Sequence, residues 1–477
     1  MQEKKEREIK KPSLALSLIT LLGSVAFILI GTTVFDAPLA VMFFLAWIIV
    51  FTVGLSLGNS YKDLENGAID MMKTSLQPTM IILAVGSMIG AWIASGTVPA
   101  IIYYGLEIVN PSLFLPFSMI LCFLTAMVTG TSWGTIGTSG LAMVGVGLGM
   151  GMNPGVVAGA AVSGAFLGAK MSPLGDAAIV DSGLVKIPLM THIKHMIPTT
   201  LPGVVISLVI YTVLGLRYSQ ANLDYSRIEI IMQDLSSVFK MGFIPLIPAL
   251  LLLILLIMRK PSFISILLGS VAGLVVAVAW QGESLSSILK IMYEGYVVKS
   301  DSEFLTTILN RGGMLNMADT TFVMFGAFGY AGIMKKAGIL DAVIQPLTAR
   351  IKSVFGLVFT TFLLVAAFLL TGGTMTFASV MTGTLMLPLY RKWKLRPENL
   401  SRAMEDCSTM LGPMVPYGVN ALYVSSMFGI PPMQFIPYSF LNMLIPITTL
   451  VFGFLNINMT RYGDDEEIPV ADETSSS

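Results

Sequence analysis

Charged residues are scarce in this chain: of its 477 residues, 12% are Asp, Glu, Lys or Arg. Soluble domains carry about 25%. The two cysteines, Cys122 and Cys407, fall in apolar or helical segments, and we interpret them as small buried side chains rather than a disulfide. The net charge is zero, so charge indicates no nucleic-acid partner. The chain lacks metal-ligand spacing, a GxxxxGKS/T phosphate loop and a nucleophile motif, which disfavours ATP-driven transport, hydrolysis, enzyme activity in general and a bound cofactor.

Apolar residues are abundant instead, at 55% of the chain with a mean hydropathy of +0.80. Runs of about 20 apolar residues, each long enough to cross a bilayer, recur from end to end. The pattern predicts an all-α polytopic membrane protein with about 11 to 13 crossings, some of them interrupted. We assign a tail to 1–12, a transmembrane domain to 13–456, and an acidic, disordered tail to 457–477. The basic start of the chain predicts a cytoplasmic N-terminus, and the first apolar run is a retained span rather than a signal peptide.

One pattern occurs twice: a Gly- and Thr-rich break inside an apolar run, then a Ser/Gly-Pro break beside carboxylates. The first copy reads TGTSWGTIGTSG (129–140) and continues to GAKMSPLGD (168–176). The second reads TGGTMTFASV (371–380) and continues to MEDCSTMLGPMVPYG (404–418). Backbone that leaves the helix inside a membrane must be buried in protein or line a cavity. Two such breaks at matching places in two halves are typical of a transporter's binding site.

The spacing and flanking charges of the two copies predict inverted repeats over about 38–185 and 262–430. Gly96 precedes Gly130 by 34 residues, and Gly338 precedes Gly372 by the same 34. The basic residues before the second copy place its start on the opposite side of the membrane from the start of the first. Chance similarity among glycine-rich membrane helices is the alternative.

The polar side chains near the breaks are the candidate site. Hydroxyl, amide and carboxylate oxygens together suit a hard cation such as Na⁺, and a carboxylate at membrane depth is costly and therefore a functional candidate. A carboxylate there can also hold a proton, so one site could hold either a proton or a cation. The candidates are Thr131, Ser132, Ser163, Lys170, Ser172, Asp176, Thr374, Thr376, Glu405, Asp406 and Asn420, with Asp176, Glu405 and Asp406 as the Na⁺ ligands.

Each candidate has a structural alternative. Ser and Thr in membrane helices commonly bond back to carbonyls, and the carboxylates could lie at an interface. Lys170 could neutralise Asp176, contact an anionic substrate, or snorkel to an interface. Asp181 lies near Lys186 in the sequence, which predicts a surface ion pair. The two histidines of THIKHMIP (191–198) read as an interfacial patch or as a pH sensor.

Two long motifs resemble the NhaC-type sodium:proton antiporters. They are GTSWGTIGTSGLAMVGVG, which continues through NPGVVAGAAVSGAFLGAKMSPLGD, and LSRAMEDCSTMLGPMVPYGVNALYVSSMFGI. The family also includes malate/lactate antiporters. The resemblance implies a secondary antiporter of the bacterial inner membrane, with inverted repeats and transported Na⁺ and H⁺.

The chain departs from the family's pattern, which is close to GDKMSPLSDTTN. Polar residues are usual where this chain has Ala169, Gly175, Ala177, Ala178 and Ile179. Our first hypothesis is Na⁺ (or a similar monovalent cation) exchanged for H⁺ by alternating access. The alternative is proton- or Na⁺-coupled exchange of small organic acids or amino acids, and a third is a membrane sensor or scaffold. A homodimer is left open.

Overall fold

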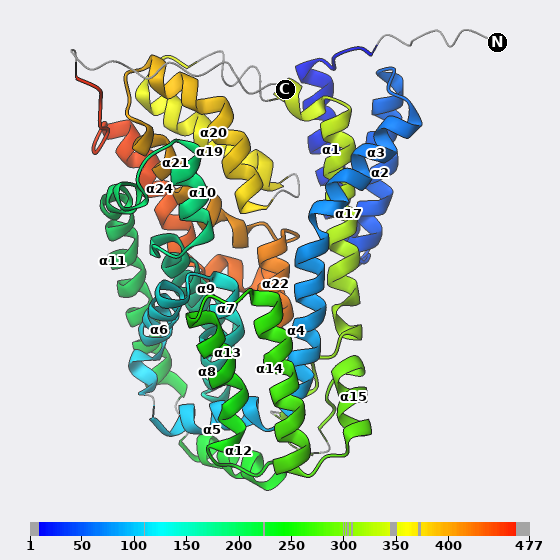
Figure 1. Ribbon diagram of the computed structural model, residues 1–477, viewed down its shortest axis with the longest axis vertical. Coiled ribbons are helices and arrows are strands. Elements are labelled where there is room, and N and C mark those ends of the chain that lie inside the picture. The colour runs from blue at the N-terminus through cyan, green and yellow to red at the C-terminus, as the bar shows by residue number, and fades with distance from the viewer. Residues whose placement is uncertain are drawn as a thin grey trace, which may run out of the picture.

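The computed structural model (Figure 1) describes residues 9–463 except 109, 223–224, 299, 301, 303–304, 307–308, 344–350 and 371–373. Within these residues the protein is built of helices, and the sole β-pairing is an isolated bridge between Leu395 and Arg461. The first-half helices are α1 (Leu14–Val34), α2 (Leu39–Ser56), α3 (Tyr61–Thr74), α4 (Leu76–Ala94), α5 (Thr97–Ile108), α6 (Phe114–Thr129), α7 (Ser132–Thr135), α8 (Leu141–Gly149), α9 (Pro154–Met171), α10 (Asp176–Leu184), α11 (Leu189–Asn222) and α12 (Tyr225–Val238). The second-half helices are α13 (Ile247–Ile257), α14 (Ser262–Val276), α15 (Leu285–Glu294), α17 (Ala318–Lys336), α19 (Val354–Leu370), α20 (Met375–Lys392), α21 (Pro397–Leu411), α22 (Val419–Phe428), α23 (Pro432–Phe435) and α24 (Phe440–Leu455).

The apolar helices confirm an all-α polytopic membrane protein. Among the described residues, seven helices are long and apolar enough to cross a membrane, or eight if α23 and α24, bent by 53° where they meet, form one span. Three further apolar helices are shorter than a span: Ile244–Ile257, Val354–Leu370 and Val419–Phe428. The sequence pattern predicts 11 to 13 crossings because it counts an interrupted apolar run as a crossing, whereas a straight helix needs about 20 residues to span.

Four helices and two amphipathic neighbours form a reciprocally packed frame. The helix α17 packs against α2 and α3, while α4 packs against α14 and α15. At Gly332 of α17, a Cβ would lie 2.2 Å from the carbonyl oxygen of Gly67 in α3. At Gly90 of α4, a Cβ would lie 2.8 Å from the carbonyl oxygen of Ile291 in α15. Figure 1 shows α3 and α15 at opposite ends of the molecule, so the two contacts have the same form at opposite ends.

The helix α21 lies at the centre of the other group of helices. It packs against α9, α10, α11, α19, α20 and α24. Every residue from Asn399 to Met410 of α21 is buried, including its charged side chains. The sequence of α21 is polar by membrane standards, so its burial depends on partners for those side chains.

The first break of the apolar pattern requires glycine at its turn. Gly130 ends α6 with φ +73°, and a Cβ there would lie 2.6 Å from the carbonyl oxygen of Leu174. Thr131 then caps α7 by accepting the backbone N–H of Gly134 at 3.3 Å, and a single π-helical turn, Ile136–Gly140, follows. In the second break, residues 371–373 lie outside the described residues, and Thr374 caps α20.

The first residues after α24 are hydrogen-bonded to the rest of the protein rather than disordered. The backbone N–H of Arg396 donates to the Thr460 carbonyl at 3.0 Å, and that of Tyr462 donates to the Lys394 carbonyl at 3.0 Å. The predicted tail boundary at 457 is therefore too early, because polar groups at the start of α21 bind this segment. Residues 464–477 lie outside the described residues.

Candidate functional site

The two breaks surround one cavity of about 1070 Å³. The first break contributes Thr129–Trp133 and the second contributes Thr374–Phe377. The starts of α10 and α14, the start of α22 and Thr409 of α21 complete much of the lining. The charged residues in the lining are Asp176, Arg259 and Lys260. The cavity therefore lies where backbone leaves the helical pattern in both halves, as a binding site between repeats would.

A hydrogen-bonded stack joins the first break to the second half at this cavity. The rings of Trp133 and Tyr423 stack with centroids 4.2 Å apart, and the Trp133 indole N–H donates to Asn420 Oδ1 at 2.9 Å. The Tyr423 hydroxyl donates back to the Trp133 carbonyl at 2.8 Å. These contacts hold the turn at the first break against α22 of the second half.

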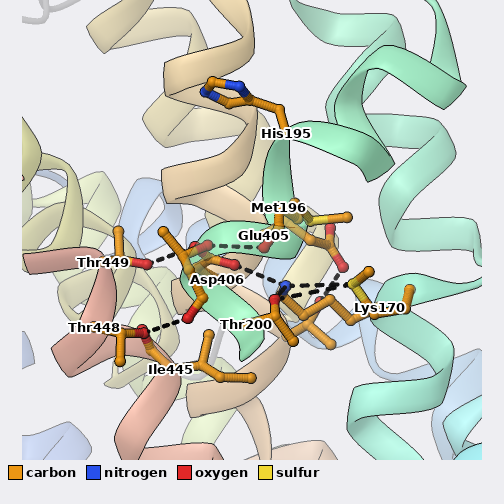
Figure 2. A network of polar contacts seen from close by, with 12 residues as sticks. Lys170, His195, Met196, Thr200, Glu405, Asp406, Ile445, Thr448 and Thr449 are labelled. Carbon is orange, nitrogen blue, oxygen red and sulfur yellow. Dashed lines mark hydrogen bonds and ion pairs between the residues drawn. The ribbon is translucent and has the colours of Figure 1, made fainter. Parts of the chain in front are cut away.

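A buried ion pair lies beside α21. Lys170 Nζ of α9 is 2.8 Å from Asp406 Oδ1, and both side chains are fully buried. Lys170 also donates to the Thr200 hydroxyl at 2.7 Å (Figure 2). Thr199 donates to Asp406 Oδ2 at 2.8 Å. Thr449 of α24 donates to the same Oδ2. A buried carboxylate is tolerated only when it is paired and hydrogen-bonded, and Asp406 is both.

A carboxyl pair lies on the neighbouring face of α21. Glu405 of α21 and Asp181 of α10 are fully buried and interact electrostatically where the two helices pack together, and Glu405 Oε2 and Asp181 Oδ1 have no hydrogen-bond partner among the described residues. The Ser379 hydroxyl of α20 lies 3.3 Å from Asp181 Oδ2. Thr409 donates to Glu405 Oε1 at 2.8 Å. Two ionised carboxylates side by side away from water would repel each other, so this pair favours a proton or a cation between them.

The carboxyl pair reaches the cavity through Thr409. This residue lines the cavity and bonds to Glu405. The helices α10 and α20, which supply Asp181 and Ser379, also line the cavity through Asp176 and Thr376. A small ion or proton in the cavity is therefore one side chain away from the carboxyl pair.

Comparison with known proteins places the chain among antiporters. A model of the Na⁺/H⁺ antiporter family matches residues 7–187 and 164–457. The chain belongs to the Na⁺/H⁺ antiporter family. A malate-2H⁺/Na⁺-lactate antiporter of Bacillus subtilis is 34% identical over 94% of this chain and 96% of that protein. The antiporter NhaC of Alkalihalophilus pseudofirmus is 30% identical over 95% and 98%, and an arginine/ornithine antiporter of Halobacterium salinarum is 29% identical over 96% and 95%.

In this antiporter the sequence-predicted residues divide into three groups. Thr131, Ser132, Asp176, Thr374, Thr376 and Asn420 line the cavity. Lys170, Glu405 and Asp406 are buried beside it. Ser163 and Ser172 are in neither place: Ser163 hydrogen-bonds to the Tyr211 hydroxyl at 2.9 Å, and Ser172 donates to the Met127 carbonyl at 2.8 Å. For these two serines the structural alternative holds, because each hydroxyl joins neighbouring segments.

The three carboxylates that the sequence suggests as Na⁺ ligands do not form one site. Among the described residues, no group of three or more His, Cys, Asp or Glu side chains converges. Asp176 is exposed at the cavity, Glu405 faces Asp181, and Asp406 faces Lys170. Lys170 therefore neutralises Asp406 rather than Asp176, and it lies outside the cavity lining.

Sequence reasoning missed Asp181. Its predicted surface ion pair with Lys186 is wrong, since Asp181 is fully buried and Lys186 is exposed beyond the end of α10. The position of Asp181 on α10 is five residues after Asp176, so helical periodicity could have turned it to another face. His192 is also buried, with Nδ1 2.9 Å from the Ser401 hydroxyl, rather than in an interfacial patch.

Proposed function

We propose that the chain exchanges Na⁺, or a similar monovalent cation, for H⁺, and that the carboxyl pair Asp181–Glu405 is the place where the two compete. The carrying observation is a pair of buried carboxyls one side chain from the cavity, each with an oxygen that lacks a hydrogen-bond partner among the described residues. One proton would let the two carboxyls hydrogen-bond to each other. Without it, two carboxylates and the hydroxyls of Ser379 and Thr409 offer the oxygen ligands that hard cations prefer.

The competition follows from charge. Two bare carboxylates in contact repel each other strongly away from water, so the pair needs one positive charge. Either a proton or a Na⁺ supplies this charge, so binding of one disfavours binding of the other. Alternate exposure of such a site to the two sides of a membrane exchanges one ion for the other.

Proteoliposomes with an imposed pH gradient test this proposal. Addition of Na⁺ should dissipate the gradient. Glu405→Gln or Asp181→Asn should each lower the initial rate of this dissipation more than about tenfold, because each removes a negative charge that cation binding needs. Glu294→Gln and Asp70→Asn are matched controls, since these carboxylates are half or more exposed in surface ion pairs. A wild-type protein that ignores Na⁺, or a Glu405→Gln variant of unchanged rate, would contradict the proposal.

The alternating movement is proposed to rest on inverted repeats over about 38–185 and 262–430. The support is the reciprocal frame, in which α3 meets α17 as α15 meets α4. Gly332 lies 242 residues after Gly90, and Gly338 lies the same 242 after Gly96. Gly96 and Gly338 both have positive φ, at +76° and +72°. We also propose that the chain lies in a bacterial inner membrane, crosses it several times, and has its N-terminus on the cytoplasmic side.

A second candidate function is exchange of a small organic anion. Its support is the cavity, which at about 1070 Å³ is far larger than a desolvated ion needs. Its lining holds Arg259 and Lys260 against the single carboxylate Asp176. Counterflow of labelled malate or lactate into proteoliposomes tests it. Uptake that falls in Arg259→Gln but not in Lys194→Gln, an exposed lysine of α11, would support an anion site, and no counterflow with any substrate would exclude it.

A further inference from the structure

Five charged side chains are fully buried among the described residues, and all lie around α21. They are Lys170, Asp181, Arg402, Glu405 and Asp406. Unpaired charge is costly at membrane depth, so the populated states of this group should be close to neutral. Its charge count therefore limits how many mobile cations it can hold.

Lys170 occupies the centre of a set of oxygen ligands. Its ammonium contacts a carboxylate oxygen of Asp406 and the hydroxyl of Thr200, and the second carboxylate oxygen accepts from Thr199 and Thr449. Carboxylate and hydroxyl oxygens are also what a mobile monovalent cation would bind. The ammonium supplies this cluster with a positive charge that is tethered to α9 and cannot leave.

Arg402 is the second fixed cation. It lies one turn before Asp406 on α21, interacts with it electrostatically, and donates from Nη1 to the Asn458 carbonyl at 2.8 Å. Other titratable groups face this region from outside the buried set. His192 and His195 of α11 hydrogen-bond to Ser401 and Asn399, and the half-buried Glu398 accepts from Thr460.

The buried group is thus one positive charge short. Lys170 and Arg402 balance two of the three carboxyls, and the remaining charge falls on the pair Asp181–Glu405. One proton or one Na⁺ at that pair makes the whole group neutral, two protons would leave it positive, and an empty pair would leave it negative. The empty state is the one least able to reorient in the membrane.

We infer that Lys170, as a built-in counter-ion, limits this antiporter to one monovalent cation per proton, so that the exchange is electroneutral. The inference rests on the proposed function, with the carboxyl pair as its exchange site. It adds to that proposal a stoichiometry and a role for Lys170 and Asp406 in which neither binds the transported ion. They set the charge of the site instead.

The first test clamps the membrane potential of wild-type proteoliposomes with K⁺ and valinomycin. Net proton flux stops at a certain ratio of the Na⁺ concentrations inside and outside, and this ratio should not change with the membrane potential. Exchange that moves one net charge per Na⁺ would instead shift the ratio about 50-fold per 100 mV. The apparent KM for Na⁺ should also change about tenfold per pH unit where H⁺ competes, as one proton requires. A potential-dependent ratio overturns this inference but leaves Na⁺/H⁺ exchange intact. Absence of any Na⁺-driven flux overturns the proposed function itself.

The second test changes the fixed charges. Asp406→Asn leaves two fixed cations against two carboxyls, so the pair needs no mobile cation and exchange should be lost. Lys170→Met leaves Asp406 bare, so exchange should persist only at lower pH, where Asp406 can hold a proton. The double variant Lys170→Met/Asp406→Asn restores the charge count and should recover exchange with the wild-type pH profile, at zero potential dependence.

Folding is monitored separately, by gel filtration and thermal unfolding of each variant. A double variant that is folded and has no Na⁺/H⁺ exchange would overturn the inference, because Lys170 or Asp406 would then act directly on the transported ions. An Asp406→Asn protein with normal exchange would overturn it as well. Only charge balance predicts that the double variant regains exchange under conditions in which both single variants have lost it.

Discussion

Removal of one partner from the ion pair between Lys170 and Asp406 should lower stability more than the loss of any other contact of the site. Two unit charges 2.8 Å apart attract by about 6 kcal/mol at an effective dielectric constant of 20. Burial of both groups offsets much of this, yet removal of one partner leaves the other without compensation. We therefore expect Lys170→Met and Asp406→Asn each to lower the free energy of unfolding by about 3–5 kcal/mol.

The double variant should lose much less than the sum of the single losses. A methionine and an asparagine leave no buried charge, and replacement of a whole buried ion pair by neutral groups is often close to neutral in free energy. The coupling energy of the cycle should thus be about 3 kcal/mol or more, well above the error of about 0.5 kcal/mol expected for independent sites.

Unfolding by SDS titration in mixed micelles, followed by the fluorescence of the five tryptophans, measures these differences. Lys194→Met is the matched control, because Lys194 is exposed on α11 and should change stability by less than about 0.5 kcal/mol. Single losses below about 1 kcal/mol, or single losses that add up in the double variant, would refute the reasoning.

Three further substitutions test separate parts of the structure. Thr199→Val removes a hydrogen-bond donor to Asp406 and should lower the free energy of unfolding by about 1–3 kcal/mol in the same titration. A loss as large as that of Asp406→Asn would contradict this. Gly332→Leu should prevent folding, since even its Cβ would meet the backbone of α3, whereas Gly183→Ala, with nothing within 4 Å, should fold normally in gel filtration. Ala169→Asp adds a carboxylate to the cavity lining and should lower the KM for Na⁺ about two- to fivefold, as expected for a partly hydrated charge; an unchanged KM would contradict it.

The sequence predicts the position of the site better than its partners. The two breaks and the acidic pair were recognisable because glycine, hydroxyl and carboxylate residues are rare inside apolar runs. That Glu405 and Asp406 are adjacent in the sequence does not reveal their functions, because adjacent residues of a helix point about 100° apart. One faces α10 and the other faces α9, and only the packing of α21 between them decides which carboxyl receives a fixed cation.

The sequence misplaces Asp181 for a related reason. Its distance of five residues from Lys186 suggested an ion pair, but α10 ends at Leu184 and Lys186 follows in a left-handed conformation, with φ +60°. The lysine is thereby exposed while Asp181 stays buried. Burial is a property of packing between distant segments, and a local spacing cannot report it.

The two candidate functions use different residues, so experiment can separate them. A small cation belongs with the buried carboxyls, which without a mobile ion carry one excess negative charge. An anion belongs with the cavity lining, where Arg259 and Lys260 outnumber Asp176. Ala169 also lies in that lining and adds no carboxylate to it. The lining therefore carries a net positive charge, which favours entry of an anion, whereas the proposed exchange site at the buried carboxyl pair needs a single cation.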